Sequence, residues 1–202
     1  IATNLSLTIT ETFRENAIVA GDGHLDYLAD IKKNNGLKNI TIKNGNILGV
    51  LVYASYTEKA MLENVRIDGN ANASGSGLLL EVVSNTKLFN VEAVRNAGNG
   101  FSTDNAVFTD WRFCLAYDNT SAGFNLDGSN QGPQRLSSCI SKGNGSFGFV
   151  CIDNGIFFFF GCSAEENDSD GFRSGESGAK SHFFGCTASN NDGSGIKFIT
   201  TG

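Results

Sequence analysis

The chain has 202 residues, of which 40% are hydrophobic and 18% charged, a composition typical of a globular protein rather than a disordered one. Its formal net charge of −6 argues against a nucleic-acid partner, because phosphate backbones bind basic surfaces. No apolar run approaches the roughly 20 residues of a membrane span, so we expect no membrane insertion. With one proline and 25 glycines, the turns must be formed mostly by Gly, Asn and Asp.

The beginning of the chain is less regular than the rest. Residues 5–9 alternate apolar and polar side chains as a strand does, and Gly21-Asp22-Gly23 has the composition of a turn. We expect residues 1–36 to form irregular or incomplete coils, and residues 37–202 to form one continuous domain of regular coils. The chain starts at Ile1 rather than Met, and neither end looks capped, so we expect a fragment of a longer chain.

From residue 37 onward, several columns of residues recur about every 24 residues. One column consists of glycine–apolar pairs: Gly77-Leu78, Gly100-Phe101, Gly123-Phe124, Gly148-Phe149, Gly171-Phe172 and Gly195-Ile196. A second column reads Ile40, Val65, Val91, Cys114, Cys139, Cys162 and Cys186. Five residues after most of these stands an asparagine: Asn70, Asn96, Asn119, Asn144, Asn167 and Asn191. The second column is flanked by two more, which begin with Leu37-Leu62-Leu88-Trp111 and with Ile42-Ile67-Ala93-Ala116.

These columns predict an all-β fold, a single-stranded right-handed parallel β-helix with about 24 residues per coil. In such a solenoid each strand pairs with the same strand one coil away, so inward side chains stack in columns. We expect the asparagines to adopt the left-handed conformation at a tight turn and to bond one another in a ladder. The repeated glycines then need positive φ or close packing. Gly and Asn interrupt every helical pattern, and the leucine-rich pattern is absent. A β-sandwich stays open, although it does not require identical columns.

The phrases at residues 37–46 and 64–70 resemble coil sequences of the pectate-lyase-like superfamily, and so do the Cys-x-Ala-x-x-Asn phrases that begin at Cys162 and Cys186. That superfamily includes polysaccharide lyases, polygalacturonases and bacteriophage tailspikes. The resemblance implies a β-helix that handles polysaccharide, most like a tailspike depolymerase domain. Its tailspike members imply a homotrimer and a virion or extracellular location. The polygalacturonase motifs and the alginate-epimerase signature are absent, so no catalytic residue is carried over.

Five cysteines accompany this pattern, and four of them occupy one inward column: Cys114, Cys139, Cys162 and Cys186. Stacked coils bring such residues roughly 5 Å apart, but an inward cysteine more often acts as a small buried hydrophobe than as half of a disulfide. The sequence has no C-x-x-C pair and only two histidines, His24 and His182, so zinc is disfavoured. We expect reduced thiols, folding in a reducing cytosol, no metal and no cofactor.

Carboxylates provide the candidate catalytic residues. Glu81, Asp104 and Asp127 stand at equivalent positions of consecutive coils, and alternation points them outward. Neighbours would lie roughly 5 Å apart, and glycoside hydrolysis uses two carboxylates at such distances. Asp104 is central and therefore the first candidate, with Glu81 or Asp127 as its partner. The alternative is solvated charge at the end of a strand.

A second outward column provides candidate substrate contacts: Lys87, Asp110, Arg135, Phe158 and His182. Lys87, Asp110, Arg135 and His182 mix charge with aromatic character, which suits a sugar chain. Arg135 can hold a uronate carboxylate or act as a base in β-elimination, but it can also form an ion pair with Asp110. His182 can stack on a sugar or lie in a subunit contact, and no nucleophile motif accompanies it or His24.

The sequence therefore favours a polysaccharide-binding and -degrading β-helix of phage tailspike type, which hydrolyses a glycosidic bond with its outward carboxylates. Two alternatives stay open. One is a non-catalytic module, either receptor-binding or structural, since every strong signal describes architecture rather than chemistry. The other is a polysaccharide lyase or epimerase, which would need a basic residue and calcium beside the acids.

Overall fold

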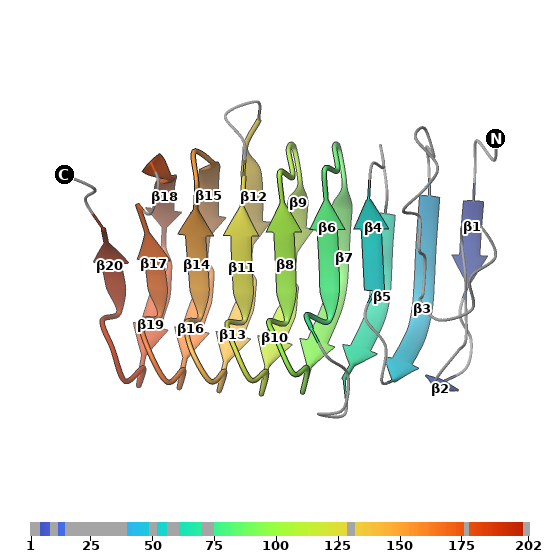
Figure 1. Cartoon of the computed structure of the whole chain (residues 1–202), viewed down its shortest axis with the longest axis horizontal. Coiled ribbons are helices and arrows are strands. Elements are labelled where there is room, and N and C mark those ends of the chain that lie inside the picture. The colour runs from blue at the N-terminus through green and yellow to red at the C-terminus, as the bar shows by residue number, and fades with distance from the viewer. Residues whose placement is uncertain are drawn as a thin grey trace.

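The computed structural model describes residues 5–8, 12–14, 40–48, 52–55, 61–69, 75–128, 132–175 and 178–199. All strand pairs within these ranges are parallel, and the chain winds as a right-handed solenoid from the N-terminal to the C-terminal end (Figure 1). The predicted fold class, an all-β parallel β-helix with about 24 residues per coil, is confirmed.

Two parallel sheets form the walls of the solenoid and face each other across its core (Figure 1). The 7-stranded sheet, which carries the glycine–apolar column, contains β4 (Val52–Ser55), β6 (Leu78–Glu81), β8 (Phe101–Asp104), β11 (Phe124–Asp127), β14 (Phe149–Ile152), β17 (Phe172–Ser174) and β20 (Ile196–Phe198). The 13-stranded sheet contains β1 (Leu5–Thr8), β2 (Thr12–Arg14), β3 (Ile40–Leu48), β5 (Met61–Asp68), β7 (Lys87–Val94), β9 (Asp110–Arg112), β10 (Leu115–Tyr117), β12 (Gln134–Ser137), β13 (Ile140–Lys142), β15 (Ile156–Phe160), β16 (Ser163–Glu165), β18 (Lys180–Phe184) and β19 (Thr187–Ser189).

The larger sheet bends at one residue per coil, and that residue has positive φ. Asn90 bends β7 in this way, and in the following coils Phe113 and Ser138 separate two short strands. Positive φ is uncommon outside glycine and unusual for a bulky residue such as Phe113. Each coil therefore has three flat sections, two in the larger sheet and one in the smaller.

The interior consists of the predicted columns. Trp111 is fully buried, and it lies between Leu88 and Leu136 of the neighbouring coils. From the opposite wall comes a stack of phenylalanine rings with centroids 4.6–4.8 Å apart: Phe101, Phe124, Phe149 and Phe172. Because each ring occupies the same position of its coil, the strand spacing itself holds the rings in contact.

The predicted asparagine ladder is present. The Nδ2 groups of Asn96, Asn119, Asn144 and Asn167 each donate to the Oδ1 of the next asparagine, at 2.8–2.9 Å. Asn70 lies outside the described residues. The expected left-handed conformation is found one residue earlier, at positions such as Arg95, Asp118 and Glu166. The preceding residue makes the turn, so the asparagine itself is left in a conformation that lets its side chain reach both neighbouring coils.

The repeated glycines are required by close packing and not by positive φ. None of the six repeated glycines, from Gly77 to Gly195, has positive φ. A Cβ on Gly77, Gly100 or Gly171 would lie 2.6–2.9 Å from the Nδ2 of a ladder asparagine. The ladder and the glycine column therefore depend on each other, because only glycine leaves room for the amides.

The register of the first regular coil differs from the sequence prediction. We expected Leu37, Ile40 and Ile42 to precede Leu62, Val65 and Ile67 in three columns. The observed pairs are Ile42 with Leu62, Gly45 with Val65, and Ile47 with Ile67. The prediction for Ile40 and Ile42 is therefore wrong by five residues, and Leu37 lies outside the described residues. The strands β1 and β2 both pair with β3, whereas the predicted domain boundary at residue 37 stays a prediction.

The four cysteines of one column point into the core, as predicted. Cys114, Cys139 and Cys162 are buried, Cys186 is half-buried, and all five cysteines of the chain are free thiols. Burial and the neighbouring thiol of Cys114 raise the pKa of Cys139 well above its usual range. Cys151 is also buried but belongs to a different column, that of Leu126 and Ser174.

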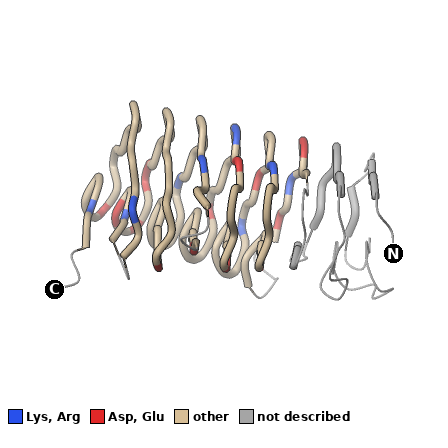
Figure 2. The backbone as a smooth tube through the Cα atoms, turned by 90° about the horizontal axis from the view of Figure 1, so that it is seen from above, with Lys and Arg blue, Asp and Glu red and all other residues tan. Residues whose placement is uncertain are grey.

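The surface shows no extended region of a single charge. Basic and acidic positions are interspersed along the described coils (Figure 2). Within the described ranges, no helix has the length and apolar character needed to cross a bilayer. Neither observation points to a function, so the candidate site must be found from local groups of side chains.

Candidate functional site

The three predicted catalytic carboxylates lie in one row on the outer face of the 7-stranded sheet. Glu81 on β6 pairs with Asp104 on β8. Asp127 ends β11, and it takes the equivalent place because the earlier residues of β8 and β11 pair in register. All three are half-buried. Neighbouring strands of a sheet lie about 4.8 Å apart, so the row can present two carboxyl groups to one bond.

A fourth acid, Asp153, completes the row. It follows β14 directly and has a φ of 56°, which turns it out of the regular alternation. Its carboxyl lies close enough to that of Asp127 to act on it electrostatically. Partial burial, followed by the negative charges of Asp153 and Asp104, raises the pKa of Asp127 from its usual value to about 7. Asp104 and Asp127 are the two interior members of this row, and Asp127 is the one whose pKa is raised.

The backbone of Asp127 is held from inside the solenoid. The Oγ1 of Thr103 accepts a hydrogen bond from the Asp127 backbone N–H at 2.8 Å and donates to its carbonyl oxygen at 2.7 Å. The buried Gln134 donates from Nε2 to the same carbonyl at 2.8 Å. Because these contacts come from two other coils, the Asp127 backbone is fixed at the edge of the sheet.

This row is suited to proton transfer. A carboxyl group with a pKa near neutrality exists in both protonation states at physiological pH, so it can donate or accept a proton. Asp104 and Asp153 lie beside it, so the row can offer a second carboxyl group to the same bond. Among the described residues, no three His, Cys, Asp or Glu side chains form a group that could hold a metal ion.

The predicted substrate-binding column lies on the other wall. Lys87, Asp110, Arg135, Phe158 and His182 pair in sequence on the outer face of β7, β9, β12, β15 and β18. That wall is separated from the carboxylate row by the core (Figure 1). The structure therefore brings Lys87 and Asp110 together and aligns Arg135 and His182 with them, but it does not bring any of them to the acids.

Two details of this column differ from the expectations. Asp110 accepts hydrogen bonds from Arg112 of its own strand, at 2.7 Å and 3.0 Å, so the ion pair expected between Asp110 and Arg135 is not formed. Arg135 is exposed and makes no ion pair with any described residue. His182 stacks on Phe158 with ring centroids 4.8 Å apart, so one face of its ring is already covered. His24 lies outside the described residues.

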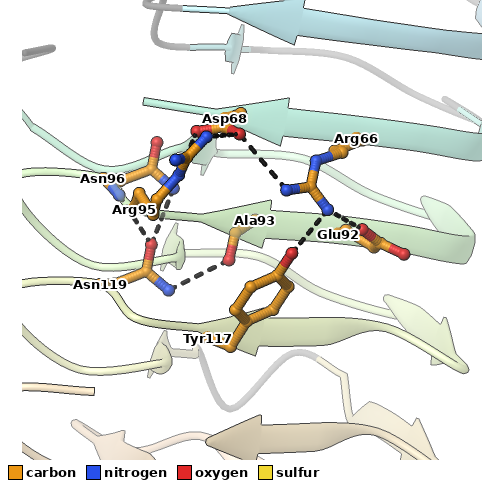
Figure 3. A network of polar contacts seen from close by, with 8 residues as sticks. All are labelled: Arg66, Asp68, Glu92, Ala93, Arg95, Asn96, Tyr117 and Asn119. Atoms are coloured by element: carbon orange, nitrogen blue, oxygen red, sulfur yellow. Dashed lines mark hydrogen bonds and ion pairs between the residues drawn. The ribbon is translucent and has the colours of Figure 1, made fainter. Parts of the chain in front are cut away.

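A polar network on the outer face of β5, β7 and β10 was not predicted (Figure 3). Asp68 is 2% exposed and accepts hydrogen bonds from Arg95 at 2.5 Å and 3.1 Å and from Arg66 at 3.3 Å. Arg66 also donates to Glu92 at 2.7 Å and to the Tyr117 hydroxyl at 2.6 Å. The charges balance within the group, so we interpret it as a structural link across three coils.

Sequence reasoning missed Asp153 and this network for different reasons. Asp153 is shifted by one residue from the column of Glu81, since Asp127 pairs with Ile152. The available signal was the turn phrase Asp153-Asn154-Gly155, which marks a residue that leaves the strand. The network joins charges whose spacing along the chain follows no single column, so the sequence carried no comparable signal.

Comparison with solved structures places the solenoid among known folds. A variant of the periplasmic alginate epimerase AlgG matches with a TM-score of 0.65 and 13% identity, over 81% of this chain and 46% of that chain. The A-module of the mannuronan C-5 epimerase AlgE4 from Azotobacter vinelandii matches with a TM-score of 0.53 and 12% identity, over 84% and 66%. These likenesses support a parallel β-helix fold.

This likeness concerns architecture. The identities of 12–13% support the fold alone, and this chain spans between 46% and 66% of the length of those two structures. No protein-family model matches the sequence, and no curated protein matches it either. Function must therefore be argued from the side chains of this chain.

Proposed function

We propose that the chain binds a polysaccharide along the outer face of the 7-stranded sheet and processes it by proton transfer at Asp127. The observation that carries the proposal is the pKa of Asp127, raised to about 7 by partial burial and by the acids Asp153 and Asp104. A row of carboxyl groups along the axis of a solenoid suits an extended glycan, because successive coils can contact successive sugars.

Hydrolysis of a glycosidic bond is the first candidate reaction. In it, Asp127 protonates the leaving oxygen, and Asp104 or Asp153 supplies the second carboxyl group. Carboxyl groups about 5–5.5 Å apart favour a covalent intermediate and retention of configuration, whereas a wider pair favours inversion. Neighbouring coils of this sheet offer the shorter distance.

Epimerisation or elimination at a uronate is the second candidate. It is favoured by the structural neighbours, because AlgG and AlgE4 are both named as alginate or mannuronan epimerases. Epimerisation at C-5 removes one proton and returns another to the opposite side of the ring, and a carboxyl group that titrates near neutrality can perform either step. The acidic row would repel a polyuronate, so this reaction needs a neutralised or protonated substrate carboxylate.

The test is incubation of the purified chain with a panel of bacterial capsule, O-antigen and alginate polysaccharides. New reducing ends indicate hydrolysis, the ultraviolet absorbance of unsaturated uronate ends indicates elimination, and a changed proton spectrum without cleavage indicates epimerisation. Asp127→Asn keeps the shape but removes the titrating group, so turnover should fall by about 10²–10⁴-fold. Asp104→Asn tests the partner.

Asp192→Asn is the matched control, because Asp192 is exposed in a turn away from the row. It should leave turnover unchanged. Full activity in Asp127→Asn would contradict the assigned role. Binding of a glycan without any change in it would favour the non-catalytic receptor-binding or structural module. The tailspike identity, the homotrimer and the virion or extracellular location rest on the sequence resemblance and stay predictions.

A further inference from the structure

A pocket of about 290 Å³ lies on the outer face of β5, β7 and β9, on the wall opposite the carboxylate row. Its lining includes Met61, Glu63, Lys87, Phe89, Asp110 and Arg112. Binding sites for drug-sized ligands occupy roughly 300–1,000 Å³. The volume at this position therefore suits a ligand the size of one sugar ring.

The charges of the pocket leave one cation available. Asp110 and Arg112 neutralise each other through two hydrogen bonds of 2.7 Å and 3.0 Å. Glu63 has other contacts of its own. Lys87 is exposed, lies beside Met61 and Asp110 in the strand register, and makes no ion pair with any residue in the described part of the chain. An anionic group that enters the pocket would pair with Lys87.

The apolar part of the pocket is held in place. Phe89 is 40% exposed, and its ring meets that of Phe113 edge to face, with centroids 5.6 Å apart and planes at 81°. Met61 lies on the neighbouring strand and lines the same pocket. An exposed aromatic ring beside a thioether offers a surface to the C–H groups of a sugar, while charged groups around it fix the orientation.

We propose that this pocket binds one anionic sugar unit, such as a uronate residue of a glycan. The ammonium group of Lys87 pairs with the sugar carboxylate, Phe89 and Met61 contact the ring, and the Asp110–Arg112 pair exchanges hydrogen bonds with hydroxyl groups. The pocket does not depend on catalysis at Asp127, because the two sites are on opposite walls. It would hold a glycan to the solenoid whether or not the other face reacts with one.

The test is a titration of the ¹⁵N-labelled chain with methyl glucuronoside and, separately, with methyl glucoside, which lacks the carboxylate. We expect saturable shifts of the backbone amides in β5, β7 and β9 with the glucuronoside, and binding about tenfold weaker with the glucoside, as is usual for the loss of one charge-assisted hydrogen bond. Lys87→Gln should weaken glucuronoside binding about tenfold and leave glucoside binding unchanged. Phe89→Ala should weaken both.

Lys180→Gln is the matched control, because Lys180 is also exposed on the outer face of this sheet but lies on β18. It should change neither affinity, and well-dispersed spectra of each variant show that it is folded. Equal affinity for both glycosides, an unchanged affinity in Lys87→Gln, or shifts confined to β8 and β11 would overturn the proposal. The amides of β5, β7 and β9 report on this pocket alone, so the titration gives an answer even if no reaction is found on the opposite wall.

Discussion

Asp127 makes the stability of the fold depend on pH. Its pKa in the folded chain, about 7, is above the ordinary value of 3.8, so the folded state binds more protons than the unfolded state between these two values. The contribution is therefore favourable at low pH and is lost as the pH rises towards 7. Above that pH the Asp127 carboxyl is ionised in both the folded and the unfolded state, so its contribution to the free energy of unfolding no longer changes with pH.

Thermal melts at a series of pH values check this expectation. The melting temperature of Asp127→Asn, minus that of the wild type, should increase from pH 4 to pH 8 and then level off. Asp192→Asn should follow the wild type in parallel at every pH. Parallel curves for Asp127→Asn as well would show that the Asp127 carboxyl is not perturbed.

Asn144 is the residue at which the ladder is best tested. Its side chain accepts from the backbone and side chain of Asn119, and donates to Asn167, Ser141 and the carbonyl of Ala116. Asn144→Leu should lower the free energy of unfolding by about 1–3 kcal/mol, because buried partners lose their hydrogen bonds. Asn154→Leu, at an exposed turn, is the control in the same denaturant titration. An equal midpoint for both variants would contradict this role.

At the scale of an element, the repeated glycine that precedes β6, β8, β11, β14 and β17 is tightly constrained. A Cβ on Gly100 would lie 2.8 Å from the Asn119 Nδ2 and 2.8 Å from the carbonyl oxygen of Gly123. Gly100→Ala should therefore destabilise the chain by about 1–3 kcal/mol, as overpacking does. The same change at Gly195 meets only the Ala188 Cβ at 3.4 Å and should be nearly neutral. Calorimetry of the two variants checks this difference.

The elements also show how far sequence reasoning reaches. Columns of one size predicted the strands that pair in the regular coils, because a repeated inward residue is a direct consequence of stacking. They did not predict the pairing of β3 with β5, where Gly45 stands in an apolar column and Val65 faces it. A short coil there shifts the register, and two apolar triplets fit the pattern equally well until hydrogen bonds select one.

The candidate site was predictable only in part, for a related reason. Alternation placed Glu81, Asp104 and Asp127 on one face, but Asp153 enters through a left-handed turn that no column predicts. Sequence spacing also gave no indication that Lys87 and Asp104 lie on opposite walls. That separation depends on the bends between strands, which arise from single residues with positive φ.

At the scale of the whole molecule, the reactivity of the thiols shows whether the interior of the solenoid excludes solvent. Four cysteines are buried, and burial raises the pKa of Cys151 to about 12. Since the thiolate is the reactive form, the native chain should react with an aromatic disulfide reagent only slowly, and all five cysteines should react at once in denaturant. Rapid reaction of several thiols in the native chain would contradict the buried column.

The asparagine ladder gives the solenoid a direction. Asn96, Asn119, Asn144 and Asn167 each donate to the asparagine of the next coil towards the C-terminal end, so these four amide–amide hydrogen bonds all point the same way along the axis. Hydrogen bonds in a chain polarise one another, so an asparagine inside the ladder strengthens more hydrogen bonds than an asparagine at either end does. The coils therefore have a fixed orientation along the axis. If one coil were inverted, the side-chain NH₂ of its asparagine would face the NH₂ of a neighbouring asparagine, or its carbonyl oxygen would face another carbonyl oxygen.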